Sequence, residues 1–120
     1  NRMGADGNPR PLHIEQSLDV TDYDRGPISP LRADVSVSGW QTLVSCDKFV
    51  LNSLPKGTAQ VGDDSQFHII TVPQGTATLR IAGEALPLRS GETLLLPAGH
   101  SGCEIEPAAK SVVLEMHLPA

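Results

Sequence analysis

The sequence predicts an all-β fold of about eight short antiparallel strands, arranged as a jelly roll or small barrel. From Gly39 onward, apolar and polar residues alternate with a period of two, which is typical of strands with one buried face. Glycines separate these runs, as at Ala82-Gly83 and Ser90-Gly91, where tight turns are expected. Aromatic residues make up only 3% of the chain, so we expect a core of Val, Leu, Ile and Ala.

Each expected strand follows from its own alternating run. The last run, residues 111–118, places Val113, Glu115 and His117 on one face and Val112, Leu114, Met116 and Leu118 on the other. This alternation is typical of an antiparallel sheet with one solvated face. In full, strands are expected at residues 40–46, 49–53, 67–72, 76–82, 85–88, 93–96, 102–106 and 111–118.

Residues 1–38 differ in composition from the rest, being rich in Gly, Pro, Asp and Arg. We expect them to form an extended arm, and residues 39–120 to form the barrel. The segment LHIEQSLDV, near residues 12–20, spaces its apolar residues for one short helix, and Pro11 precedes it as a helix start tolerates. Gly26-Pro27 and Ser29-Pro30 then enforce an extended path. The arm is therefore expected to lie along another surface.

Charge and composition exclude several classes of partner. The net charge is −5, from 9 basic and 14 acidic side chains that are scattered along the chain. Without a Lys/Arg stripe, neither nucleic acid nor an anionic membrane is an expected partner. No apolar stretch approaches the ~20 residues of a membrane helix, and no leader resembles a signal peptide. We expect a cytoplasmic protein, with Cys46 and Cys103 as two reduced, buried thiols.

Two segments, FHIITVPQGTATLRIAG (67–83) and GETLLLPAGH (91–100), resemble the two sequence motifs of the cupin barrels. Those motifs normally carry a metal, so the resemblance places four ligand positions in this chain. Two of the four have no side-chain donor, whereas a transition-metal ion needs three or four N, O or S ligands. The barrel is therefore expected to be free of metal, even with His100 recruited from two residues before the fourth position. The four positions are Gly62, Asp64, His68 and Gly102.

The opening stretch RMGADGNPRPLHIEQSLD (2–19), followed by VSCDKFVLNSL (44–54), resembles the C-terminal part of short, bacterial-type class I mannose-6-phosphate isomerases. The resemblance covers nearly all of the chain. It implies an aldose–ketose isomerase that interconverts mannose 6-phosphate and fructose 6-phosphate at a zinc site. In that family the zinc ligands and the active-site arginine lie in the catalytic half, upstream of this stretch. We therefore expect a C-terminal domain with no catalytic residue and no cofactor of its own, whose partners are the catalytic half and a sugar phosphate.

The same resemblance indicates which residues of the arm reach substrate in an intact enzyme. Arg2 falls a few residues after the position of the active-site arginine, and Arg10 has the planar fork that binds a phosphate through two hydrogen bonds. His13 is a candidate for orienting one of them. The alternative is that Arg10 and His13 only fasten the arm across the barrel.

Two other functions stay open from the residues alone. One is a free-standing small cupin that binds a carbohydrate or another small ligand without metal, in a pocket formed by His68, Thr78, Arg80 and His100. The other is a metal-dependent cupin enzyme with a reduced site at Asp64, His68 and His100. If the isolated domain exposes the surface that normally meets the catalytic half, a homodimer is expected as well.

Overall fold

The computed structural model describes residues 2–120, and the chain separates into two units, Asn1–Pro30 and Leu31–Ala120. The boundary lies earlier than the expected position after residue 38. Residues beyond Pro30 belong to the barrel because Asp34 and Gln41 exchange two hydrogen bonds. The Asp34 amide donates to Gln41 Oε1 at 2.8 Å, and Gln41 Nε2 donates to the Asp34 carbonyl at 2.6 Å.

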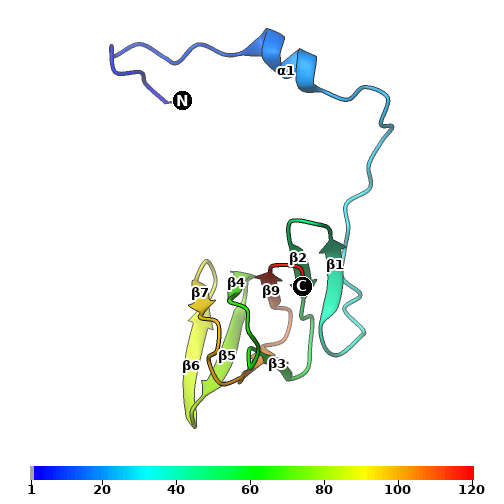
Figure 1. Cartoon of the computed structure of the whole chain (residues 1–120), viewed down its shortest axis with the longest axis vertical. Helices are drawn as coiled ribbons and strands as arrows, with labels where there is room; N and C mark the ends of the chain where they lie inside the picture. Colours follow the sequence, from blue (N-terminus) through cyan, green and yellow to red (C-terminus); the bar gives the residue numbers. More distant parts are fainter. Residues whose placement is uncertain (1) are drawn as a thin grey trace. The chain divides into compact units, whose positions relative to one another are not determined.

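The second unit is an all-β jelly roll of two antiparallel sheets (Figure 1). One sheet has the strand order β1-β2-β9-β4-β7, and the other has the order β3-β8-β5-β6. The predicted fold class is confirmed. Within residues 2–120 the nine strands are β1 (Gln41–Ser45), β2 (Val50–Ser53), β3 (Ala59–Val61), β4 (His68–Gln74), β5 (Thr76–Ile81), β6 (Glu84–Arg89), β7 (Thr93–Leu96), β8 (Cys103–Pro107) and β9 (Val112–His117).

Strand β3 is the one that periodicity did not predict. It has only three residues, too few for an alternating pattern to stand out. It forms because it pairs with β8, with Ala59 opposite Ile105 and Val61 opposite Cys103. The turn that follows uses Gly62 in a left-handed conformation, with φ at 89°.

The core between the sheets is aliphatic, as the composition predicts. Its largest fully buried side chains include Leu54, Ile70, Leu79 and Ile105, each at most 1% exposed. Leu79 and Ile105 are direct partners across the β5–β8 pair of one sheet. Ile70 lies in β4 of the other sheet, so both sheets contribute to one contiguous cluster. Phe67 lies outside this core and is 37% exposed.

Strand β9 turns its more polar face inward. Val113 and Glu115 are 0% and 3% exposed, whereas Val112 and Leu114 on the opposite face are half-buried. The strand lies in the middle of its sheet, between β2 and β4, so its inward side chains meet residues of both neighbours. A carboxylate is consequently buried inside the barrel, where it needs polar partners.

The two cysteines are both free, but only one of them is buried. Cys103 is 2% exposed, and burial raises the pKa of its thiol. The expectation that Cys46 is buried was wrong. Cys46 follows the end of β1, where its amide donates to the Phe49 carbonyl at 3.1 Å to close the turn into β2, and this places it at the surface.

The first unit contains the predicted short helix, α1 (Ile14–Val20). None of its residues is buried, and the apolar side chains of Ile14 and Leu18 are 61% and 56% exposed. Before α1, an isolated bridge between Met3 and Pro9 closes a small turn. Within the described residues, we find no helix that is both long and apolar enough to cross a membrane.

Candidate functional site

Three adjacent strands, β2, β9 and β4, bring a polar cluster together on the inward face of their sheet. Register places Asn52 of β2 opposite Glu115 of β9, and Glu115 opposite Ile70 of β4. His68 lies two residues before Ile70 and therefore on the same face, and His117 lies two residues after Glu115. The strand pairing alone thus places two imidazoles, a carboxylate and an amide side by side.

Glu115 is the centre of this cluster. Its Oε1 accepts hydrogen bonds from Nδ1 of His68 at 2.6 Å and from Nδ1 of His117 at 2.9 Å. Its Oε2 accepts one from Nδ2 of Asn52 at 2.7 Å. The side chains of Glu115 and His68 are only 4% and 7% exposed, and that of His117 is 26% exposed. The buried carboxylate is thereby fully partnered, as low polarity requires.

His68 is held at both ring nitrogens. While Nδ1 meets Glu115, Nε2 donates to Asp64, at 3.0 Å to Oδ1 and 2.9 Å to Oδ2. Burial by itself lowers the pKa of His68, but the hydrogen bonds and charges of Glu115 and Asp64 outweigh it and raise that pKa above 6.5. The pKa of Asp64 is lowered, first by the Gln66 amide that donates to it and then by His68.

The cluster opens into a cavity of about 200 Å³, which Trp40, Gln60 and Gly62 also line. Trp40 itself is fixed by its Nε1, which donates to the Gln60 carbonyl at 2.9 Å. The arrangement offers two imidazoles, two carboxylates and an aromatic face next to open space. Such a set suits binding of a cation or of a polar ligand with several hydroxyl groups.

Among the described residues that the cupin resemblance singles out, only Asp64 and His68 are joined by a side-chain hydrogen bond. Gly62 and Gly102 lie close to each other but offer no donor; a Cβ on Gly62 would come within 3.5 Å of the Gly102 Cα. The Nδ1 of His100 bonds to the Ser101 carbonyl at 2.6 Å, and His100 does not line the cavity of His68.

The other two pocket candidates lie outside the barrel. Thr78 and Arg80 alternate along β5 with the buried Ala77 and Leu79, so they occupy the outward face. Arg80 forms an exposed ion pair there with Glu106, with Nη1 3.2 Å from Oε2. The structure therefore separates Thr78 and Arg80 from His68, because the strand period is two.

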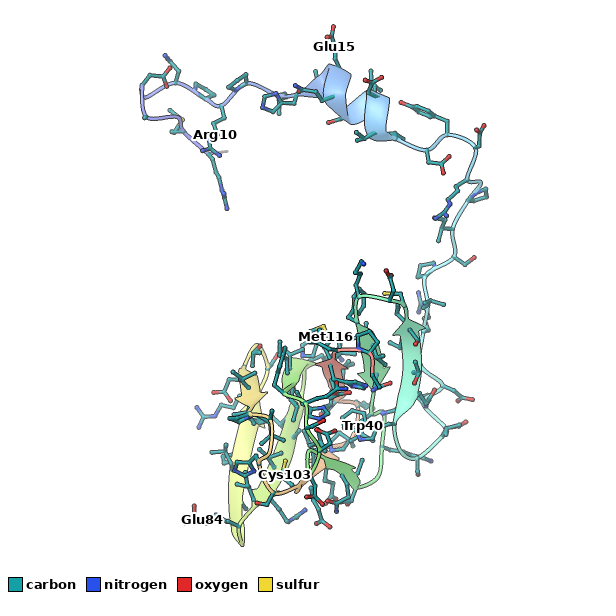
Figure 2. The ribbon with its side chains drawn as sticks, in the orientation of Figure 1. Arg10, Glu15, Trp40, Glu84, Cys103 and Met116 are labelled. Carbon is teal, nitrogen blue, oxygen red and sulfur yellow. The ribbon has the colours of Figure 1, made fainter. Side chains whose placement is uncertain are left out.

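In the arm, the structure brings Arg2 and Arg10 close in space. The Arg10 amide donates to the Arg2 carbonyl at 3.2 Å, across the turn that the Met3–Pro9 bridge closes. Figure 2 shows the Arg10 side chain extending away from this turn. His13 is the N-terminal flanking residue of α1, and its carbonyl accepts the Ser17 amide. All three candidate residues are exposed.

Glu115 and His117 are the site residues that sequence reasoning missed. The available signal was the Glu-x-His spacing on the last strand, which puts both side chains on one face. That face also carries Val113, and an isolated Glu-x-His pair on a strand is common at protein surfaces. The pair becomes part of a cluster because β4 pairs with β9 and brings His68 within hydrogen-bond distance of Glu115.

Comparison with known proteins supplies the family. A family model described as the mannose-6-phosphate isomerase cupin domain matches residues 37–115. A mannose-6-phosphate isomerase of Streptococcus mutans is 30% identical over 100 residues, which are 81% of this chain and 31% of that protein. The mannose-6-phosphate isomerase ManA of Bacillus subtilis is 28% identical over 120 residues, which are 94% of this chain and 37% of that protein. The chain thus spans about a third of the length of these relatives.

Comparison with solved structures leads to the same family. The crystal structure of the mannose 6-phosphate isomerase from Bacillus subtilis superposes with a TM-score of 0.64, at 22% identity. The match covers 98% of this chain and 38% of that one.

Proposed function

The chain belongs to the family of mannose-6-phosphate isomerase cupin domains, and from this premise we propose that it is the C-terminal domain of a mannose-6-phosphate isomerase-like enzyme. In the intact enzyme, a catalytic half holds the zinc and interconverts mannose 6-phosphate and fructose 6-phosphate. This domain packs against the catalytic half, stabilises it and carries no catalytic residue. At the cupin motif positions, Gly62 and Gly102 supply no donor, so the motif metal is absent.

The exposed apolar face of α1 carries this proposal. A helix of seven residues is too short to be stable in water without packing, yet Ile14 and Leu18 are both more than half exposed. Within the described residues of the arm nothing covers these side chains, so a packing partner is required. The matched relatives extend over about three times the length of this chain, which leaves ample sequence to form that surface.

We further propose that the arm presents Arg10 and Arg2 to the phosphate of the substrate, with His13 beside them. A guanidinium binds a phosphate bidentately, and a hydrogen bond to a charged group contributes about 1.5–3 kcal/mol.

Two unpaired cysteines support a cytoplasmic location, where sugar phosphates and reduced thiols occur together.

The test of the arm is the Arg10→Ala variant in the longer enzyme that contains this domain. Loss of one phosphate contact lowers kcat/KM about 10- to 100-fold. Arg25→Ala is the matched control, because Arg25 is also an exposed arginine of the arm and, among residues 2–120, pairs only with Asp22, at 3.6 Å. If Arg10→Ala and Arg25→Ala both retain the kcat/KM of the unchanged enzyme, Arg10 does not contact the substrate. The remaining role for Arg10 is then to fasten the arm.

A second candidate function rests on the cavity beside Trp40. An aromatic face next to amides and carboxylates is a typical lining for a sugar, which favours a free-standing cupin that binds a carbohydrate without metal. Trp40 is the single tryptophan of the chain, so its fluorescence reports on binding in this cavity. A saturable change with mannose or mannose 6-phosphate, added to the 120-residue chain alone, would support this function over the first.

A further inference from the structure

We propose that the barrel binds one divalent transition-metal ion through His68, Glu115 and His117. This site differs from the four positions that the cupin motifs define, since only His68 belongs to both sets. It also departs from the metal-free barrel that the sequence alone predicts. The proposal depends on the inward face of β9, which no motif marks.

The donors match the needs of such an ion in type and in position. Each of the three side chains offers one ligand atom, and these atoms lie within 4.8 Å of one another. Two imidazole nitrogens and one carboxylate oxygen form the ligand set of many zinc and non-haem iron sites. Around an ion with bonds of about 2.1 Å, tetrahedral ligand atoms are about 3.4 Å apart. The present contacts of 2.6 and 2.9 Å need to open by less than about 1 Å to reach this spacing.

The surrounding groups orient the ligands as they do in known metal sites. A metal-binding histidine usually donates its other ring N–H to a carboxylate, and here Nε2 of His68 donates to Asp64 at 2.9 Å. This leaves Nδ1 to face the ion. In the same way, Nδ2 of Asn52 holds Oε2 of Glu115 at 2.7 Å and leaves Oε1 for the ion.

Charge favours a dication at this place. Once His68 has released its Nδ1 proton, both imidazoles are neutral, and the carboxylates of Asp64 and Glu115 carry two negative charges. Glu115 is almost completely buried. A dication makes the cluster neutral, whereas buried unbalanced charge is costly. On binding, the proton between Nδ1 of His68 and Oε1 of Glu115 leaves to solvent, and His117 exchanges its Nδ1 proton for one on Nε2. The freed Nδ1 lone pairs then bind the ion. The cavity next to His117 leaves room for a water as the fourth ligand.

The direct test is a titration of the 120-residue chain, freed of any affinity tag and stripped with EDTA, with Zn²⁺ followed by calorimetry. One equivalent is expected to bind. A parallel titration with Co²⁺ is expected to give the visible absorption of a four- or five-coordinate site, which requires no variant. Absence of saturable Zn²⁺ binding, together with a Co²⁺ spectrum of the hexaaquo ion, would overturn the proposal.

Variants then locate the ion. His117→Ala removes a ligand that is partly exposed, and Glu115→Gln keeps the shape of the buried side chain, so circular dichroism can verify that both fold. Both are expected to lose the Zn²⁺ site. Asp64→Asn keeps all three ligands and is expected to weaken binding about 10- to 100-fold with the stoichiometry unchanged.

The control is His100→Ala, because the side chain of His100 bonds to the Ser101 carbonyl and lies outside the cluster. It is expected to bind Zn²⁺ as the unchanged chain does. If His100→Ala abolishes binding, or if His117→Ala retains it, the ion is bound elsewhere and the assignment is wrong. Since no catalytic half is present in these titrations, their outcome is independent of whether the longer protein is an isomerase.

Discussion

Replacement of Glu115 by alanine tests whether the polar cluster stabilises the barrel. The change removes the acceptor for three donors, Nδ1 of His68, Nδ1 of His117 and Nδ2 of Asn52. It also leaves His68, whose side chain is 7% exposed, without its closest carboxylate. Breaking a buried ion pair from one side costs about 3–5 kcal/mol, a large part of the 5–15 kcal/mol that holds a typical domain.

The assay is urea denaturation in the presence of EDTA, so that no bound ion adds to the result. For a domain of this size, a loss of about 3 kcal/mol also lowers the melting temperature by at least about 12 °C. Glu104→Ala is the matched control, because in the described part of the chain the Glu104 side chain accepts a hydrogen bond only from the exposed Nε2 of Gln60. This variant is expected to cost below about 1 kcal/mol. If Glu115→Ala costs no more than Glu104→Ala, the cluster does not stabilise the fold and the reasoning fails.

Two further outcomes follow from the backbone and the thiols. Gly75→Ala is expected to lower the free energy of unfolding of the barrel by about 3 kcal/mol. Gly75 has a left-handed φ, and an added Cβ would lie only 2.8 Å from the Ser111 Cα. The resulting shift of Ser111 would also break the hydrogen bond from the Thr76 amide to the Ser111 hydroxyl. Gly83 has the same φ of 80° but open space around it, so Gly83→Ala is expected to lower the free energy of unfolding by only about 1–2 kcal/mol. Equal losses of stability for Gly75→Ala and Gly83→Ala in urea denaturation would contradict this prediction. A thiol reagent should modify the exposed Cys46 at once and the buried Cys103 only after denaturation, and mass spectrometry showing equal rates would refute that assignment.

The barrel was predictable because its signal is local. Alternation with period two and glycine turns gave eight of the strands, and the ninth, β3, escaped because three residues are too short to show a period. The arm helix was equally visible, since Ile14 and Leu18 have helical spacing and Pro11 precedes them.

The polar cluster was not predictable in the same way, because it depends on which strands become neighbours. His68 and Glu115 are 47 residues apart in the chain and meet only because β4 pairs with β9. The pocket expected at Thr78 and Arg80 failed for a related reason. Their strand register turns them outward, and a one-residue shift in register exchanges the two faces of a strand.

The most direct test of the proposed function is the rate of mannose 6-phosphate isomerisation, measured for the 120-residue chain and for the longer enzyme under the same conditions with added zinc. We expect turnover by the longer enzyme and none by the chain alone, because the proposed function places the catalytic residues in the catalytic half. Isomerisation by the 120 residues without any partner would contradict it.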